Sequence, residues 1–235
     1  MTRVGVVLPV ANQADHIERV VEAYLRALDE IVAVEFVLAV NNSRDDSLAS
    51  CRRLAEAHPE RVSVVATPAG WGNAVIGGLR TTSASVIGFA NSARTHDVDL
   101  LRGVRCALEH RDALVKGRRT TRAYSPLRRF GSRMYNAECR AFFGIESADI
   151  NGNPKIWHRT LLPPELLSEP GSFLDAEVLI HARQRGLPVL EFPIVRMDRH
   201  GGESMTTLRL ASTLYARPVA VKLSRGRELA ASHSG

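Results

Sequence analysis

The chain has 235 residues and a net charge of +6, and no run approaches the roughly 18 consecutive apolar residues of a membrane-spanning helix. Its three cysteines, Cys51, Cys106 and Cys139, are too widely spaced for a metal-ligand motif, which argues against a zinc site or a disulfide framework. We therefore expect one α/β domain with free thiols. Because Met1 leads into a strand-like segment without a signal peptide, we also expect a cytoplasmic location.

Strand-like and helical segments alternate from the first residues onward. Segment 3–9 is typical of a buried strand, and the following helix repeats its apolar side chains on one face from Ile17 to Leu28. We then expect strands at 35–40, 61–66, 85–90, 112–116 and 188–195, and helices at 46–57, 71–81, 97–109, 133–142, 173–185 and 206–223. This alternation predicts a mostly parallel sheet flanked by helices, with ligands at the carboxyl ends of the strands.

Polar or small residues follow three of these strands. The first strand delivers Pro9 to Gln13, and the second delivers a turn from Asn41 to Asp46. Turn chemistry explains the second cluster as well as ligand binding does, because Asn, Asp and Ser bond their own backbone and cap helices. Gly70 and Gly72 start a helix whose amides could approach a phosphate, with a simple tight turn as the alternative.

Arginines gather at 118–133, between a predicted strand and a predicted helix. The planar arginine fork binds phosphate in a bidentate manner, so this segment is a candidate phosphate site. The alternative is a solvated basic loop or a membrane-surface patch. The segment has only Tyr124 and Phe130 as aromatic residues, which disfavours a nucleic-acid partner.

The order of these motifs resembles the family 2 inverting glycosyltransferases of GT-A fold, most closely the dolichol-phosphate mannose synthase-like branch. The matching parts are Leu8-Pro9 with Asn12, then 41–46, 70–72, His96-Asp97, Arg118-Arg119, 128–133, 149–155, 191–194 and 199–204. The resemblance covers roughly residues 4–205. It divides the chain into a glycosyltransferase-like domain at 1–205 and a basic helix and tail at 206–235.

The resemblance implies a role for each motif. The nucleotide-sugar site would contain Pro9, Ala11, Gln13, Asn41, Gly70, Gly72, Asn91, Ser92 and Ala93. The phosphates of the donor and of a lipid-phosphate acceptor would face Arg119, Arg129, Ser132, Arg199 and Ser204. These roles are implied by the resemblance to the family.

One departure from the family concerns its metal-binding Asp-x-Asp triplet, which is matched here by Asn91-Ser92-Ala93. A hard divalent cation prefers anionic oxygen ligands, and this triplet supplies none. We therefore expect no resident metal, with Mg²⁺ or Mn²⁺ as the alternative. Arg94 either turns inward, where its charge would partly replace that of the metal, or points to solvent.

The leading hypothesis is transfer of a sugar from a nucleotide-diphosphate sugar to a polyprenyl phosphate, with peripheral membrane contact, or to another phosphate-bearing small molecule. A phosphate acceptor is already ionised and needs no strong general base. For a hydroxyl acceptor, Asp149 or Asp175 is the catalytic base to test, although either is equally explained by a structural role. The second hypothesis is a non-catalytic relative that binds a partner enzyme. A homodimer is a further candidate assembly.

Overall fold

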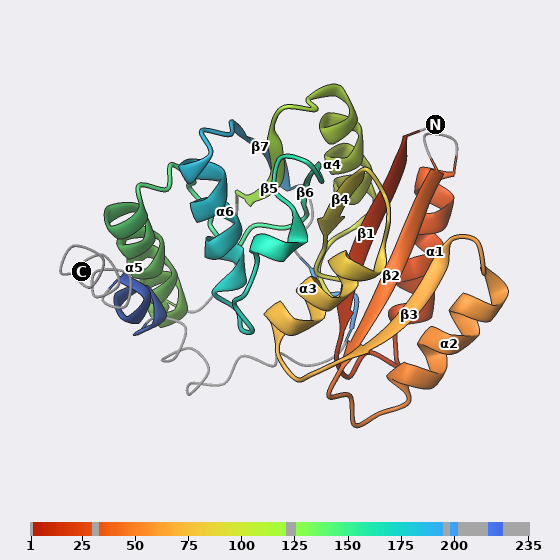
Figure 1. Ribbon diagram of the computed structural model, residues 1–235. Helices are drawn as coiled ribbons and strands as arrows, with labels where there is room; N and C mark the ends of the chain where they lie inside the picture. Colours follow the sequence, from red (N-terminus) through yellow and green to blue (C-terminus); the bar gives the residue numbers. More distant parts are fainter. Residues whose placement is uncertain (1, 30–32, 121–125, 195–197, 202–215, 223–235) are drawn as a thin grey trace, which may run out of the picture.

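The computed structural model describes residues 2–29, 33–120, 126–194, 198–201 and 216–222 (Figure 1). Seven strands form one sheet in the order β3-β2-β1-β4-β6-β5-β7. The strands are β1 Arg3–Val10, β2 Ala33–Asn41, β3 Val62–Thr67, β4 Val86–Phe89, β5 Leu114–Arg119, β6 Lys155–His158 and β7 Val189–Ile194. The helices are α1 Ile17–Leu28, α2 Ser47–Ala57, α3 Trp71–Thr81, α4 Asp97–Glu109, α5 Pro126–Phe143, the short 3-10 helix η1 Pro164–Leu166, and α6 Leu174–Gln184.

The sheet is mostly parallel. Strand β1 pairs in parallel with β2 and β4, β2 with β3, and β5 with β7. Strand β6 lies between β4 and β5 and runs antiparallel to both. The single-domain α/β fold with a mostly parallel sheet, expected from the sequence, is confirmed.

Each face of the sheet has its own apolar core. Because successive strand side chains point to opposite faces, Val6 and Leu8 of β1 join one core while Val7 joins the other. Helices α1, α2 and α4 cover the first core, and α3, α5 and α6 cover the second (Figure 1). Burial on both faces explains why the central strands read as continuous apolar runs.

Three elements differ from the sequence-based expectation. Strand β5 continues to Arg119 because its last residues pair with β7, so Arg118 and Arg119 belong to the sheet and not to a basic loop. Helix α5 begins at Pro126 and not near residue 133. Strand β6 was not predicted, since it is only four residues long and starts with a lysine.

The carboxyl-terminal helix expected at 206–223 is only partly within the description. Residues 216–222 are helical, whereas the rest of that stretch and the domain boundary at 205/206 fall outside the described residues. Arg217 ties this helix to the body of the protein, because its Nη2 lies 2.8 Å from Glu169 Oε2. No helix in the described part of the chain is long and apolar enough to cross a membrane.

The glycines at the start of α3 permit close backbone packing. Gly70 has a φ of 128°, which disfavours other residues, and the backbone amide of Asn73 donates to the carbonyl of Pro170 at 3.1 Å. A Cβ atom added at Gly72 would lie 1.8 Å from the carbonyl oxygen of Glu169. The segment after η1 therefore packs directly onto this turn. This packing explains why both positions are glycine, and a bound phosphate is not needed to explain them.

We predict that Gly72→Ala lowers the free energy of unfolding by at least about 3 kcal/mol, because overpacking against a backbone carbonyl forces the chain to move. Gly186→Ala is the control: its φ is 65°, but a Cβ there meets no atom within 4 Å. The control should cost only about 1 kcal/mol for its left-handed backbone. Urea unfolding of the two variants measures the difference, and equal losses would contradict the packing explanation.

Candidate functional site

The carboxyl ends of β4, β5 and β7 meet the leading loop of β6 at one edge of the sheet. Because β6 is antiparallel to its neighbours, the loop that precedes it lies at the edge where the other strands end. A cavity of about 50 Å³ opens there, and we call it the edge cavity. Its lining residues are Asn91, Arg94, Thr95, Asp99, Arg119, Asn151, Asn153 and Ile194.

Most polar groups in the turn after β4 form hydrogen bonds within the turn or with the segment next to it. Asn91 Oδ1 accepts a hydrogen bond from the amide of Ala93 at 3.1 Å, and the carbonyl of Asn91 accepts from the amides of Arg94 and Thr95 at 2.9 and 2.7 Å. The carbonyl of Ala93 accepts from the amide of His200 at 3.0 Å. The turn therefore brings Arg94 to the lining of the edge cavity.

Ser92 faces the protein interior and not the edge cavity. It is fully buried, and its Oγ lies 3.1 Å from the carbonyl oxygen of Pro9 and 2.7 Å from Gln13 Oε1. Its one hydroxyl proton can serve either acceptor. Ala93 is also buried. Of the predicted triplet, the structure brings only Asn91 to the cavity, because Ser92 joins the turns after β1 and β4.

The turns after β1 and β2 are joined to each other by side-chain hydrogen bonds. Asn12 Oδ1 accepts from the amide of Arg44 at 2.8 Å, and the amide of Gln13 donates to Ser47 Oγ at 2.7 Å. Pro9, Ala11, Gln13 and Asn41 thus lie on neighbouring strand ends, while Gln13 and Asn41 are largely buried. Several polar groups of these residues therefore form hydrogen bonds between the two turns.

Asp149 is held by a salt bridge to Arg119. Asp149 is 1% exposed, its Oδ2 accepts from the backbone amide and Nε of Arg119 at 3.0 and 2.8 Å, and its Oδ1 accepts from Nη2 at 2.5 Å. Burial alone would raise the pKa of Asp149, but the Arg119 contacts and the charge of Lys116 lower it to about 2. The predicted catalytic base is therefore a weak base at neutral pH, and the geometry gives it a structural role.

Asp175, the other predicted base, is paired with Lys155 in the interior. The Lys155 ammonium donates to Asp175 Oδ1 and to the carbonyl of Gly152 at 3.0 Å, and it lies 5.4 Å from the centre of the Phe89 ring. Burial lowers the pKa of Lys155 despite this pairing. Both candidate carboxylates are thus paired with cations, so neither is positioned as an unpartnered proton acceptor.

Lys116 completes this buried ionic network. Its Nζ donates to the carbonyl of Asp149 at 2.6 Å and to Glu191 Oε1 at 3.0 Å. Burial, followed by the charge of Lys155, lowers the pKa of Lys116 to about 8, although Glu191 and Asp149 oppose that shift. The network joins β5, β6, β7 and α6 beneath the edge cavity.

The predicted phosphate ligands do not converge on one place. Arg119 lines the edge cavity, whereas Arg199 lines a second cavity of about 330 Å³ beside α1 and the start of α4. On α5, Arg129 is exposed and Ser132 half-buried, and neither lines these two cavities. Ser204 lies outside the described residues.

Histidines from three distant segments meet beside the turn after β4, and the sequence analysis did not identify this cluster. The rings of His96 and His200 lie 4.3 Å apart, and His200 Nε2 is 2.7 Å from the carbonyl oxygen of Thr95. A Cβ on Gly201 would lie 2.7 Å from Nδ1 of the buried His16. Segment 198–201 therefore packs against both His16 and His96. Only the proximity of His96 and His200 to recognised motifs could have signalled the cluster.

The comparisons with known proteins agree with this geometry. The model of glycosyl transferase family 2 matches residues 5–166. A crystal structure of glucosyl-3-phosphoglycerate synthase from Mycobacterium tuberculosis with Mn²⁺, UDP-glucose and glycerol 3-phosphate superposes with a TM-score of 0.73 at 21% identity, over 95% of this chain and 80% of that one. The same enzyme with Mn²⁺, UDP and phosphoglyceric acid gives 0.70 at 20% identity, over 95% and 78%. No curated protein sequence matches significantly.

The fold is therefore that of GT-A sugar transferases, with the cavity at the sheet edge where such folds bind ligands. The chain belongs to glycosyl transferase family 2. This membership supports glycosyl transfer from a nucleotide-sugar donor. At about one-fifth identity, the superposed structures show a shared fold and leave the acceptor to be proposed.

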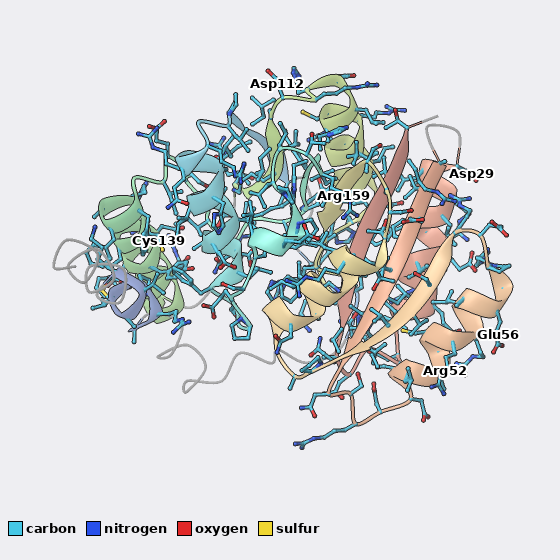
Figure 2. All side chains as sticks on the ribbon, in the orientation of Figure 1. Asp29, Arg52, Glu56, Asp112, Cys139 and Arg159 are labelled. Carbon is cyan, nitrogen blue, oxygen red and sulfur yellow. The ribbon has the colours of Figure 1, made fainter. Side chains whose placement is uncertain are left out.

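We predict that Asp149→Asn lowers the free energy of unfolding at pH 7 by about 3 kcal/mol, because it breaks a buried ion pair. The folded-state pKa of Asp149 is lowered from 3.8 to about 2, so the carboxylate stabilises the fold above pH 4 and loses this effect as pH falls towards 2. Urea unfolding at a series of pH values should show the gap between wild type and variant narrowing over that window. Asp112→Asn, at an exposed position on the protein surface (Figure 2), should match the wild type throughout, and a pH-independent gap would contradict the ion-pair account.

We also predict that the histidine cluster makes stability fall as pH drops from 7 to 5. Burial and the charges of His96, His16 and Arg19 lower the pKa of His200 below its ordinary 6.5, although the Thr95 carbonyl opposes them. The unfolded chain then binds more protons, so stability is lost below the ordinary value, by at most about 1.4 kcal/mol per pH unit for one proton. His200→Gln should flatten this slope, while His110→Gln, at an exposed position, should not. Identical slopes in all three proteins would contradict the prediction.

Proposed function

We propose that this protein transfers a sugar from a nucleotide-diphosphate sugar to an acceptor that carries a phosphate group. The observation that carries the proposal is the edge cavity, which is lined by Arg94 and Arg119 and opens at the sheet edge of a family 2 glycosyltransferase. Guanidinium groups bind phosphate oxygens through charged, directional hydrogen bonds. The superposed enzyme supports the acceptor class, since it was crystallised with glycerol 3-phosphate and with phosphoglyceric acid.

The pairing of both predicted bases favours an acceptor that is already ionised. Asp149 and Asp175 are each paired with a cation, Arg119 and Lys155, so neither is arranged to remove a proton from a hydroxyl group. A phosphate monoester brings an anionic oxygen and needs no proton acceptor. A polyprenyl phosphate, the acceptor of the dolichol-phosphate mannose synthase-like branch, is our proposed acceptor for this reason.

The proposed reaction is a single in-line displacement at the anomeric carbon. An acceptor oxygen attacks that carbon and forms the new glycosidic bond, while the bond to the donor diphosphate breaks and its electron pair leaves with the nucleotide. Arg94 and Arg119 would stabilise the negative charge that develops on the departing diphosphate. The strand ends that carry Pro9, Ala11, Gln13 and Asn41 would hold the nucleoside, and Gly70 and Gly72 would keep the adjoining turn packed.

The surface of α5 supports peripheral membrane contact for a lipid-linked acceptor. Phe130 is 64% exposed and Met134, one turn later, is 42% exposed, with the exposed Arg129 and Arg133 beside them. An apolar pair flanked by arginines suits an anionic lipid surface. In this arrangement Arg129 and Ser132 would face the acceptor headgroup, whereas Arg199 lies away from them, beside α1 and the start of α4. A homodimer and a partner enzyme stay predictions.

The proposal is tested by measuring sugar transfer from UDP-glucose and GDP-mannose to glycerol 3-phosphate and to a short polyprenyl phosphate, with EDTA or with Mn²⁺. Transfer to the polyprenyl phosphate alone supports the lipid acceptor, and transfer to glycerol 3-phosphate alone supports a soluble one. If every combination yields neither transfer nor donor hydrolysis, the protein is the non-catalytic relative, which would then act by binding.

We predict that Arg119→Lys weakens nucleotide diphosphates more than the matching nucleosides, by about 1.5 to 3 kcal/mol for a lost charged hydrogen bond. Lysine at 119 keeps the charge beside Asp149 but loses the bidentate fork. Calorimetric titration of UDP against uridine, and of GDP against guanosine, measures the effect. Arg52→Ala on α2, at the outer edge of the molecule (Figure 2), is the control, and equal losses for nucleoside and diphosphate would place Arg119 away from the phosphates.

A further inference from the structure

We propose that Arg94, with Arg119, binds the diphosphate of the donor directly, in the place where a divalent cation serves relatives of this fold. The inference rests on the proposed function, because it assigns how the same site would hold its donor. The superposed enzyme was crystallised with Mn²⁺ together with UDP-glucose, so a cation is the expected partner of the diphosphate there. The residues of this chain do not fit such a cation.

The turn after β4 provides no set of metal ligands. Asn91 Oδ1 is engaged by the amide of Ala93, Ser92 Oγ points towards Pro9 and Gln13, and Ala93 has no side-chain oxygen. Mg²⁺ at a phosphate-binding site is held by one or two carboxylates together with the substrate phosphates, and residues 91–95 supply no carboxylate. Across the described part of the chain, no three His, Cys, Asp or Glu side chains are grouped to hold a metal ion.

The charges that line the edge cavity favour an anion instead. They are the guanidinium groups of Arg94 and Arg119 and the single carboxylate of Asp99. The two guanidinium groups outnumber the one lining carboxylate, so the lining repels a divalent cation and attracts a phosphate.

Two buried amide oxygens also point to a ligand in this cavity. Asn151 Oδ1 and Asn153 Oδ1 are buried, and neither has a hydrogen-bond donor among the described residues. The amide nitrogen of Asn153 is fixed by the carbonyl of Asn151 at 3.2 Å and by Asp175 Oδ1 at 3.4 Å, so its oxygen must be satisfied from another direction. A buried acceptor needs a partner, and the hydroxyl groups of a sugar linked to the bound phosphate are suitable donors.

Arg94 and Arg119 are held in position by different means. The salt bridge to Asp149 fixes the Arg119 guanidinium, which keeps 18% exposure. The backbone of Arg94 is fixed by the turn, in which its amide donates to the carbonyl of Asn91 at 2.9 Å. The Arg119 guanidinium is thus oriented before the ligand binds, and a charge positioned in advance can stabilise a departing diphosphate without a metal.

The test measures binding of inorganic pyrophosphate to the full chain in EDTA by calorimetry. We expect wild type to bind, Arg94→Gln to bind at least tenfold more weakly, and Arg94→Lys to be intermediate because it keeps the charge without the fork. Arg52→Gln is the matched control for loss of one positive charge and should bind as wild type does. Melting temperatures confirm that each variant is folded. Wild-type affinity in a folded Arg94→Gln protein would overturn the inference, as would failure of wild type to bind pyrophosphate.

A second arm measures UDP binding with EDTA and with Mn²⁺. Wild-type affinity should change less than tenfold, whereas Asn91→Asp combined with Arg94→Gln should bind UDP at least tenfold more tightly when Mn²⁺ is present. A tenfold loss of wild-type affinity on chelation would overturn the inference. Sugar transfer is assayed separately. If Arg94 is needed for pyrophosphate binding but no sugar is transferred, only the proposed function is refuted. If sugar is transferred in a Mn²⁺-dependent reaction that Arg94→Gln does not change, only the inference is refuted.

Discussion

The salt bridge between Asp149 and Arg119 is the interaction on which the site depends. Asp149 takes both backbone and side-chain hydrogen bonds from Arg119, so it fixes the end of β5 and the direction of the guanidinium together. Its carbonyl also accepts from Lys116, which in turn reaches Glu191 of β7. Buried ammonium and carboxylate groups are strongly destabilising unless each is paired and hydrogen-bonded. The pairing therefore constrains how β5, β6 and β7 sit against one another beneath the edge cavity.

The direction of β6 explains why residues so far apart in sequence share that cavity. Parallel strands bring only their carboxyl ends to one edge, but an antiparallel strand brings the loop that precedes it. The loop with Asn151 and Asn153 consequently faces Arg94 after β4 and Arg119 at the end of β5. Gly152 sits within this loop, where an added Cβ would lie 2.0 Å from the carbonyl oxygen of Gly117. Close backbone contact between loop and strand thus keeps the two asparagines at the cavity.

Sequence patterns predicted the parts of this molecule that depend on local periodicity. The apolar face of α1 and the limits of α3 and α4 follow from side-chain spacing, and they agree with the structure. Strand β6 was not predicted because a lysine is typical of the protein surface. Lys155 is buried only because it pairs with Asp175, 20 residues later. Asp149 was predicted as a candidate base for the same reason. The sequence shows a carboxylate, but it does not show that this carboxylate pairs with Arg119, 30 residues away. The histidine cluster likewise joins residues separated by more than 100 positions.

The absence of a carboxylate at position 91 and the presence of Arg94 are electrostatically one feature. An aspartate could replace Asn91 without disturbing the turn, because either side chain accepts the hydrogen bond from the amide of Ala93. That carboxylate would, however, lie in the same small cavity as Arg94 and Arg119, which already holds the carboxylate of Asp99. A second carboxylate would balance the positive charges of the two arginines, so the cavity would attract an anion less strongly. A cation bound beside the new carboxylate would in turn be repelled by both arginines. Conversion to a metal site therefore requires replacement of Arg94 together with Asn91, because either change alone leaves opposing charges in one cavity.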